Sequence, residues 1–158
     1  MKKTVYIDTT VPSYYVDTRP SLSVHIDRKR VWWDKERDYY EVFTSGFVLR
    51  ELEEGNYPNK LSAIALLEKI PLLAPNSEIE IIVEQYIENY LMPINDVRDA
   101  FHLAFASFYK PDYLLTWNCT HLANVNKRSH IARVNQKLGF FTPGIVTPLE
   151  LLLPERSD

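Results

Sequence analysis

The segment Thr4-Val5-Tyr6-Ile7-Asp8-Thr9-Thr10-Val11-Pro12 combines a strand, a turn and the start of a helix. Its first four residues are β-branched or aromatic and indicate a buried strand. The threonines and the proline that come later suit a turn into a short helix, because Thr caps helices and Pro fits their first turn. The carboxylate of Asp8 is therefore expected at the carboxyl end of the first strand.

The alternation of short apolar strands and longer helical segments continues along the chain. Further strands are predicted at residues 39–44, 70–74, 113–117 and 145–147. Helices are predicted at residues 22–38, 47–55, 58–69, 78–90, 96–109 and 125–138. Ser45 is expected to cap the helix that starts near Phe47. Strands that alternate with helices predict an α/β fold whose central, mostly parallel sheet is covered on both faces.

Length and composition predict one domain that spans residues 1–158. With 158 residues and a hydrophobic fraction of 46%, the chain can bury a sizeable core without disulfides or a structural metal. Its one cysteine, Cys119, excludes an intramolecular disulfide, and no Cys/His pattern resembles a zinc site. A reducing, cytoplasmic location is therefore expected.

The net charge and the hydropathy of the chain limit which classes of function are expected. Asp8 interrupts the N-terminal apolar run and the apolar tail at 149–153 is short, so neither a signal peptide nor a membrane span is expected. The net charge is −3, whereas proteins that bind nucleic acid through phosphate contacts are usually basic. This charge argues mildly against a large nucleic-acid footprint, but it does not exclude an enzyme whose positive charge arrives with bound metal.

Polar residues cluster where the predicted strands end. In open parallel sheets, sites lie outside the carboxyl ends of the strands. The residues expected at that edge are Asp8, Glu51, Asp99 and Asn118. Each also has a purely structural interpretation: a helix cap for Asp8, a surface pair with Arg50 for Glu51, a favourable first-turn charge for Asp99 and a turn for Asn118.

Three carboxylates at one edge indicate a cation. Like charges about 4 Å apart cost roughly 4 kcal/mol at an effective dielectric constant of 20. Without compensation, such a cluster raises a carboxylate pKa and destabilises the fold. A divalent ion removes this penalty, and oxygen ligands favour Mg²⁺ or Mn²⁺. Metal held in this way can activate water and stabilise a pentacovalent phosphate.

The polar residues lie in four short segments, which are Val5–Ser13, Thr44–Leu52, Asp99–Ala106 and Leu114–Asn118. In this order the segments resemble the motifs of PIN domains, particularly the VapC-like ribonucleases that are the toxins of type II toxin–antitoxin systems. The first and third segments are the most specific. The resemblance extends from Thr4 to about Pro148 and implies a three-layer α/β/α fold.

The resemblance also implies a function, a metal-dependent endoribonuclease that hydrolyses RNA phosphodiester bonds. By position, Asp8, Glu51 and Asp99 would be the ligands of Mg²⁺ or Mn²⁺. Thr9 and Thr116 would orient these carboxylates by hydrogen bonds. VapC-like proteins pair with a small antitoxin and often form homodimers, so both kinds of partner are expected beside the RNA substrate.

Asn118 departs from the family pattern, which often has Asp at this position. Asparagine supplies a carbonyl oxygen but no charge, so Asn118 would be a neutral fourth ligand and binding of a second metal would be weaker. Whether the site binds one metal ion or two therefore stays open. The alternative function is a catalytically weak or inactive PIN-like module that binds RNA or a protein partner.

Two of the ligand positions have rivals nearby in the sequence. Glu54 shares nearly the same helix face as Glu51, but Glu51 is closer to the strand end and is preferred. Asp96 precedes Asp99 by three residues, and Asp99 is preferred because it begins the matching motif. His102 follows Asp99 on the helix and is expected beside the site or, more simply, as a buried structural histidine.

The sequence defines the residues that would contact the substrate less clearly than the metal ligands. The charged segment from Arg28 to Tyr40 contains Trp32 and Trp33, which could stack on RNA bases, although core-facing aromatics are the preferred interpretation. His121 and Asn124 follow the fourth motif and are expected to be exposed loop residues, with substrate contact as the alternative. A third interpretation of the charged segment is a surface for a partner protein.

Two other enzyme classes fit less well. An aspartyl-phosphate phosphatase would place Asp8 at the end of the first strand, but these enzymes show Asp-x-Asp-x-Thr and this chain has Thr10 at the second acidic position. Nucleotide-cofactor binding is disfavoured because the chain has four glycines and neither a Gly-x-Gly-x-x-Gly motif nor a P-loop.

Overall fold

A computed structural model describes residues 1–19 and 26–153 of the chain. Its centre is a five-stranded, all-parallel sheet in the order β3-β2-β1-β4-β5. The strands are β1 (Lys3–Ile7), β2 (Tyr40–Ser45), β3 (Leu72–Leu73), β4 (Tyr113–Leu115) and β5 (Gly144–Val146). Val5 of β1 lies opposite Val42 of β2 on one side and Tyr113 of β4 on the other. The predicted parallel sheet is confirmed.

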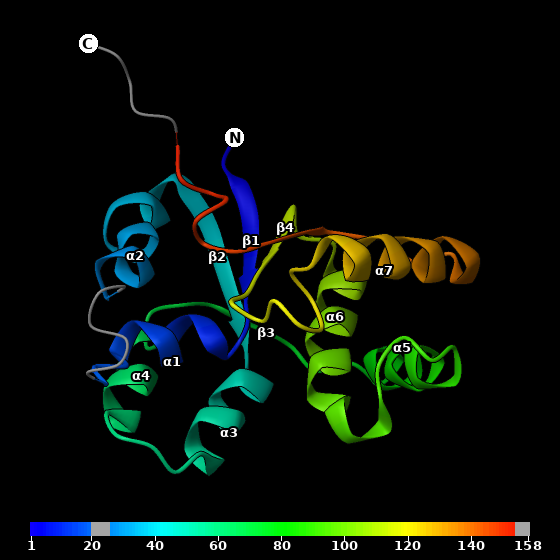
Figure 1. Cartoon of the computed structure of the whole chain (residues 1–158), viewed down its shortest axis with the longest axis horizontal. Coiled ribbons are helices and arrows are strands. Elements are labelled where there is room, and N and C mark those ends of the chain that lie inside the picture. Colours follow the sequence, from blue (N-terminus) through cyan, green and yellow to red (C-terminus); the bar gives the residue numbers. More distant parts are fainter. Residues whose placement is uncertain (20–25, 154–158) are drawn as a thin grey trace.

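Helices cover both faces of this sheet and give three layers (Figure 1). Helices α1 to α4 lie on one side, and α5 to α7 lie on the other. Their bounds are Thr10–Val16 (α1), Ile26–Val31 (α2), Gly46–Glu54 (α3), Lys60–Leu66 (α4), Ser77–Glu88 (α5), Val97–Tyr109 (α6) and Val125–Leu138 (α7). No helix in the described part of the chain combines the length and apolarity that crossing a membrane requires.

The strand order reverses direction between β1 and β4. The chain builds β1, β2 and β3 outward in one direction and then returns to place β4 on the other side of β1. At such a switch point the connections leave the two neighbouring strands toward opposite faces, which opens a crevice at their carboxyl ends. The residues directly after β1 and β4 therefore occupy the position where α/β sheets bind ligands.

Local signals place the elements near their predicted positions. Ser45 caps α3, because its hydroxyl accepts a hydrogen bond from the Val48 backbone N–H at 3.3 Å. Gly139 ends α7 with a φ of 76°, a left-handed conformation that suits glycine. Asn59 also has a positive φ, of 65°, so α4 begins at Lys60 rather than at residue 58.

Two predicted elements differ from the structure. The helix predicted at residues 22–38 is not uniform: α2 continues into a π-helical turn at Trp32–Glu36 and a 3₁₀ turn at Arg37–Tyr39, and residues 22–25 lie outside the described residues. Strand β4 ends at Leu115 instead of residue 117, because the Trp117 backbone N–H donates to the Thr10 hydroxyl rather than to a strand.

The core confirms the structural interpretation of the Trp32–Trp33 pair. Trp32 is 1% exposed and Trp33 is 6% exposed, so neither indole is available to stack on RNA. The Arg37 guanidinium lies over the face of the Trp33 ring, 4.6 Å from its centroid. The aromatic residues of this segment therefore stabilise the layer of α1 to α4.

A buried polar network joins the helices of the other layer. The hydroxyl of Tyr86 on α5 donates to Asn135 Oδ1 on α7 at 2.7 Å and lies 2.7 Å from Ser107 Oγ on α6. The Asn135 amide in turn donates to Phe141 O and to Thr142 Oγ1, at 3.2 and 3.1 Å. Asn135 is 0% exposed, so its amide makes these bonds away from bulk water.

We predict that Asn135→Ala lowers the free energy of unfolding by about 2 to 4 kcal/mol, because it leaves several buried polar groups without partners. Urea denaturation of the metal-free protein measures this. Asn126→Ala on the exposed surface of the same helix is the matched control and should change stability by less than about 0.5 kcal/mol. Equal effects of the two substitutions would contradict the predicted role of the network.

Candidate metal site at the carboxyl edge of the sheet

Asp8 is held rigidly at the carboxyl end of β1. Its Oδ1 accepts hydrogen bonds from the Thr10 backbone N–H at 3.0 Å and from the Thr10 hydroxyl at 2.5 Å. Its Oδ2 accepts a hydrogen bond from the hydroxyl of Thr116, at the end of β4. The carboxylate is 2% exposed, and this burial raises the pKa of Asp8 although the charge of His102 and the threonine hydrogen bonds lower it.

The interpretation of Asp8 as a helix cap is met only in part, because Thr9 occupies the cap position of α1. Asp8 instead accepts the Thr10 N–H and forms a local turn at the start of α1. A turn of this kind needs neither a hydroxyl from a distant strand nor almost complete burial. In this structure the hydroxyl of Thr116 donates to Asp8, and the crevice between β1 and β4 buries the carboxylate.

Glu51 on α3 reaches the same edge and forms an ion pair with His102 of α6. Its Oε1 lies 2.5 Å from His102 Nε2 and accepts a hydrogen bond from Thr9 Oγ1 at 2.8 Å. The other imidazole nitrogen, Nδ1, lies 3.2 Å from the hydroxyl of Tyr6. Glu54 is exposed, so Glu51 is the residue of α3 that faces the site.

The contact between Glu51 and His102 shifts their pKa values in opposite directions. Burial alone would raise the pKa of Glu51, but the hydrogen bond and charge of His102 outweigh it and lower that pKa. Burial alone would lower the pKa of His102, but the Glu51 hydrogen bond and the charges of Asp8, Glu51 and Asp99 outweigh it and raise that pKa. All three predicted carboxylates therefore favour the charged form of one buried imidazole.

Asp99 lies in the first turn of α6 and contacts Asn118. Burial raises the pKa of Asp99, while the charge of His102 and a hydrogen bond from the Asn118 side chain lower it. The Asn118 Oδ1 accepts the backbone N–H groups of Thr120 and His121, at 3.2 and 2.9 Å. Asn118 thus uses its oxygen to form the turn after β4 and directs its amide toward Asp99.

The turn at Asn118 brings a second set of ligands to Asp99. Asp96, Asp99 and His121 each offer a ligand atom, and these atoms lie within 4.8 Å of one another. His121 Nε2 is 3.3 Å from Asp96 Oδ2. These three residues could hold a metal ion. Within residues 1–19 and 26–153 they form the one group of three or more acidic, His or Cys side chains with this spacing.

The sequence analysis identified only part of this second set of ligands. Asp96 was the recognised rival of Asp99, whereas His121 was expected to be an exposed loop residue. His121 is partly buried because the Asn118 oxygen binds its backbone N–H and turns the chain back toward α6. An Asn that follows a strand and is followed by His within three residues is the signal that could have indicated this geometry.

No protein-family model matches this chain, and no curated protein or solved structure matches it either. The chemistry of the site therefore follows from its own side chains. Glu51 contacts His102 at the switch point of a parallel sheet, and the charges of Asp8 and Asp99 act on the same imidazole. Among the described residues, the ligand atoms that lie within 4.8 Å of one another are those of Asp96, Asp99 and His121, and not those of Asp8, Glu51 and Asp99. This arrangement can bind a cation and place it next to a crevice.

We predict that the stability of the metal-free protein falls as the pH rises above about 6.5. A histidine whose pKa is raised by folding stabilises the fold fully below its unfolded pKa, near 6.5, and this contribution is lost as the pH rises through the folded pKa. Unfolding free energies measured across this range in EDTA should show the decline in wild type and not in His102→Gln.

His130→Gln is the control for the histidine substitution. Burial and the neighbouring charges of Lys127 and Arg133 lower the pKa of His130, so its contribution changes below pH 6.5 and not above it. The His130 variant should keep the wild-type decline. A decline of the same slope in His102→Gln would show that the Glu51–His102 pair is not its source.

Proposed function

We propose that this chain is a metal-dependent endoribonuclease that hydrolyses RNA with one Mg²⁺ or Mn²⁺ ion held by Asp8, Glu51 and Asp99. The observation that carries the proposal is the buried carboxylate of Asp8 at the carboxyl ends of β1 and β4, where the charges of Asp8, Glu51 and Asp99 all act on His102. Buried charge is costly unless it is paired, and strongly shifted pKa values concentrate at functional sites.

The donor atoms suit a hard divalent cation. Both Asp8 oxygens accept hydrogen bonds from threonines, which fix their orientation, and a carboxylate oxygen has a further lone pair for a metal. Thr9 and His102 orient Glu51 in the same way, and Asn118 orients Asp99. Oxygen donors favour Mg²⁺ or Mn²⁺, and any contribution from His121 would favour Mn²⁺.

The charge of the site supports one ion rather than two. With one negative charge on each of Asp8, Glu51 and Asp99 and one positive charge on His102, the set would carry a charge of −2, which a single divalent ion would balance. Asn118 adds no charge to this set, and the fourth carboxylate, that of Asp96, belongs to the second set with Asp99 and His121. His102 thus acts as the internal cation of the site.

The bound ion would supply an activated water and would neutralise charge that develops on the phosphate. The residues of the chain contribute position: Thr10 and Thr116 hold Asp8 against β4, and the buried Tyr6–His102–Glu51 series holds α3 and α6 at a constant separation. The RNA substrate, the role as a toxin, the small antitoxin and the homodimer are supported by the resemblance of the four motifs to VapC-like ribonucleases.

We predict that Mg²⁺ or Mn²⁺ raises the melting temperature of wild type, because an ion that binds only the folded state stabilises it by about 2.7 kcal/mol at a hundredfold excess over its dissociation constant. The rise should vanish in Asp8→Asn and Asp99→Asn and persist in Glu54→Gln, the control on the exposed side of α3. Differential scanning fluorimetry over an ion titration measures it.

Further variants distinguish the two ligand sets. Asp99 belongs to both, whereas Asp96 and His121 belong only to the second set. The proposal therefore expects Asp96→Asn and His121→Gln to keep most of the metal-induced rise that Asp8→Asn loses. The opposite pattern, with the rise lost in the Asp96 and His121 variants and kept in Asp8→Asn, would place the ion at the second set.

We also predict that wild type cuts single-stranded RNA with Mg²⁺ or Mn²⁺, and that Asp8→Asn and Asp99→Asn each slow cleavage by about a hundredfold or more while they remain folded. Several kcal/mol of charge stabilisation in the transition state is lost with the metal. Gel analysis of end-labelled RNA measures the rates, with Glu54→Gln as the active control. Metal binding without cleavage at any ion concentration would instead favour the inactive PIN-like module.

A further inference from the structure

A cavity of about 430 Å³ lies at the carboxyl ends of β2 and β3, outside the crevice between β1 and β4. Gly46, the first residue after β2, and Pro75, which follows β3, border it. Its other walls come from α3, α5 and α6, so the cavity lies where the two helical layers meet (Figure 1). The volume is in the range of small-molecule sites, and α/β sheets bind ligands at the carboxyl ends of their strands.

The walls of this cavity are mainly apolar and aromatic. The rings of Phe47 on α3 and Phe101 on α6 stack, with centroids 4.9 Å apart and an interplanar angle of 25°. Ile79 and Phe105, which also line the cavity, are 2% and 5% exposed. Walls of this kind favour an aromatic ring, because flat rings bury a large apolar area and stack on one another.

Arg50 adds a cation to this apolar cavity. Its side chain is exposed, and within residues 1–19 and 26–153 it forms no ion pair. The surface pair of Glu51 with Arg50 that the sequence offered is not formed, because Glu51 pairs with His102. A guanidinium binds a carboxylate through two parallel hydrogen bonds, so the cavity combines a place for a ring with a place for an acid group.

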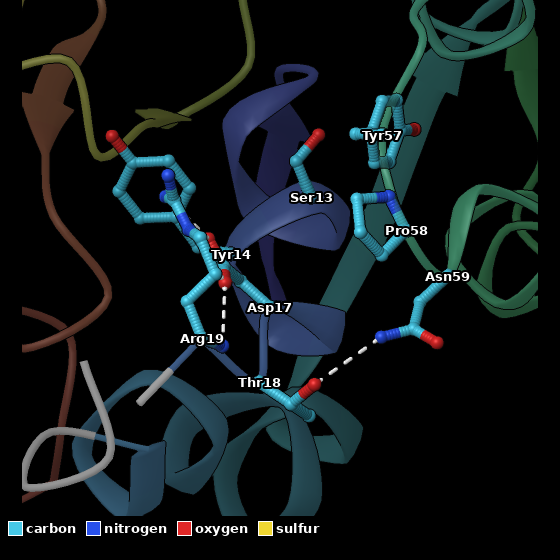
Figure 2. Close-up of a pocket in the computed structure, with 8 residues that line it drawn as sticks. All are labelled: Ser13, Tyr14, Asp17, Thr18, Arg19, Tyr57, Pro58 and Asn59. Carbon is cyan, nitrogen blue, oxygen red and sulfur yellow. Dashed lines mark hydrogen bonds and ion pairs between the residues drawn. The ribbon is translucent and has the colours of Figure 1, made fainter. Parts of the chain in front are cut away.

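A cavity beside α1 is less suited to an acid (Figure 2). It measures about 480 Å³ and extends from Tyr14 to Asn59. Its cation is Arg19, whose guanidinium forms a 2.6 Å ion pair with Asp17 and donates further hydrogen bonds to the same carboxylate. The charge of Arg19 is therefore already balanced within the chain, and the cavity at Gly46 is the stronger candidate for an anionic ligand.

Gly46 leaves the cavity open at the start of α3. The chain has four glycines, and the other three have local reasons: Gly139 has a left-handed φ, and a side chain at Gly55 or Gly144 would collide with a tyrosine ring, at 2.5 and 2.9 Å. A Cβ at Gly46 would meet no atom within 4 Å, and its φ is not positive. Glycine loses more conformational freedom on folding than other residues, and here neither backbone nor packing requires it. The open cavity is the feature that a side chain at this position would remove.

The cavity shares two helices with the Glu51–His102 pair. Arg50 directly precedes Glu51 on α3, and Phe101 directly precedes His102 on α6. The ring of Phe47 also contacts the imidazole of His102, with centroids 5.3 Å apart and an interplanar angle of 66°. A molecule that packs on Phe47 and Phe101 therefore acts on the two helices whose separation sets the contact between Glu51 and His102.

We propose that this cavity binds an aromatic carboxylic acid, whose ring packs on Phe47 and Phe101 and whose carboxylate pairs with Arg50. The bound acid contacts the ring of Phe47 and so regulates the Glu51–His102 contact through α3 and α6. The inference goes beyond the proposed function, because the ligand is a small molecule in a separate cavity and its binding requires neither metal nor RNA.

The test is an NMR titration of the full-length protein in EDTA with 3-phenylpropionate as the probe. We expect a Kd of about a millimolar or tighter, the range for a ligand of this size. The neutral amide of the same acid should bind about tenfold more weakly, because it lacks the charge that Arg50 pairs with. Arg50→Gln should weaken binding of the acid by about tenfold and leave binding of the amide unchanged.

Arg133→Gln is the matched control, because Arg133 is an exposed arginine of α7 that does not line the cavity. It should bind the acid as wild type does. Gly46→Leu places a side chain in the cavity and should abolish binding, and melting temperatures confirm that each variant is folded. L-Phenylalanine adds an ammonium group that Glu80, also at the cavity, can pair with. Tighter binding than 3-phenylpropionate would identify an amino acid as the ligand, and weaker binding a simple acid.

The same spectra report on the Glu51–His102 pair. The imidazole signals of His102 should shift when the acid binds, and those of His130 on α7, outside the cavity, should not. Binding that leaves the His102 signals in place would overturn the regulatory role. Equal binding of the acid to wild type, Arg50→Gln and Gly46→Leu, or no binding to wild type, would overturn the site itself, whether or not the protein binds metal or cuts RNA.

Discussion

The buried hydrogen bonds of Asp8 are the interaction on which the rest of the site depends. They join three elements that are distant in sequence: the end of β1, the start of α1 through Thr10, and the end of β4 through Thr116. A carboxylate that is 2% exposed needs these donors, since burial raises its pKa and opposes its charge. The position at the switch point of the sheet makes this burial possible, because β1 has a parallel neighbour on each side.

A second constraint comes from His102, which lies among the three carboxylates. Its imidazole is 3% exposed and contacts Glu51 on one side and Tyr6 on the other. A cluster that contained only carboxylates would depend wholly on metal for its compensation. Here a positive charge on the histidine would offset part of the negative charge without metal.

The aromatic residues of the α1–α4 layer are divided between core and surface. Trp32 and Trp33 fill the space between α2 and the sheet, while Tyr14 and Trp117 lie at the crevice beside Asp8. The charged segment that contains Trp32 and Trp33 looked suitable for RNA, but its alternation of charged and aromatic residues is also that of an amphipathic helix. The burial of Trp32 and Trp33 is the arrangement that the sequence analysis preferred for this segment.

Much of the architecture followed from the order of apolar strands and capped helices, because periodicity and turn residues are local properties. Ser45, Gly139 and the strand before Asp8 were predicted in this way. The partners of the polar side chains were not local. Only the turn at Asn118 brings His121 to Asp96 and Asp99, and only the packing of α3 against α6 sets His102 on Glu51. Such contacts depend on distances between elements, and residue type and spacing along one chain contain no measure of those distances.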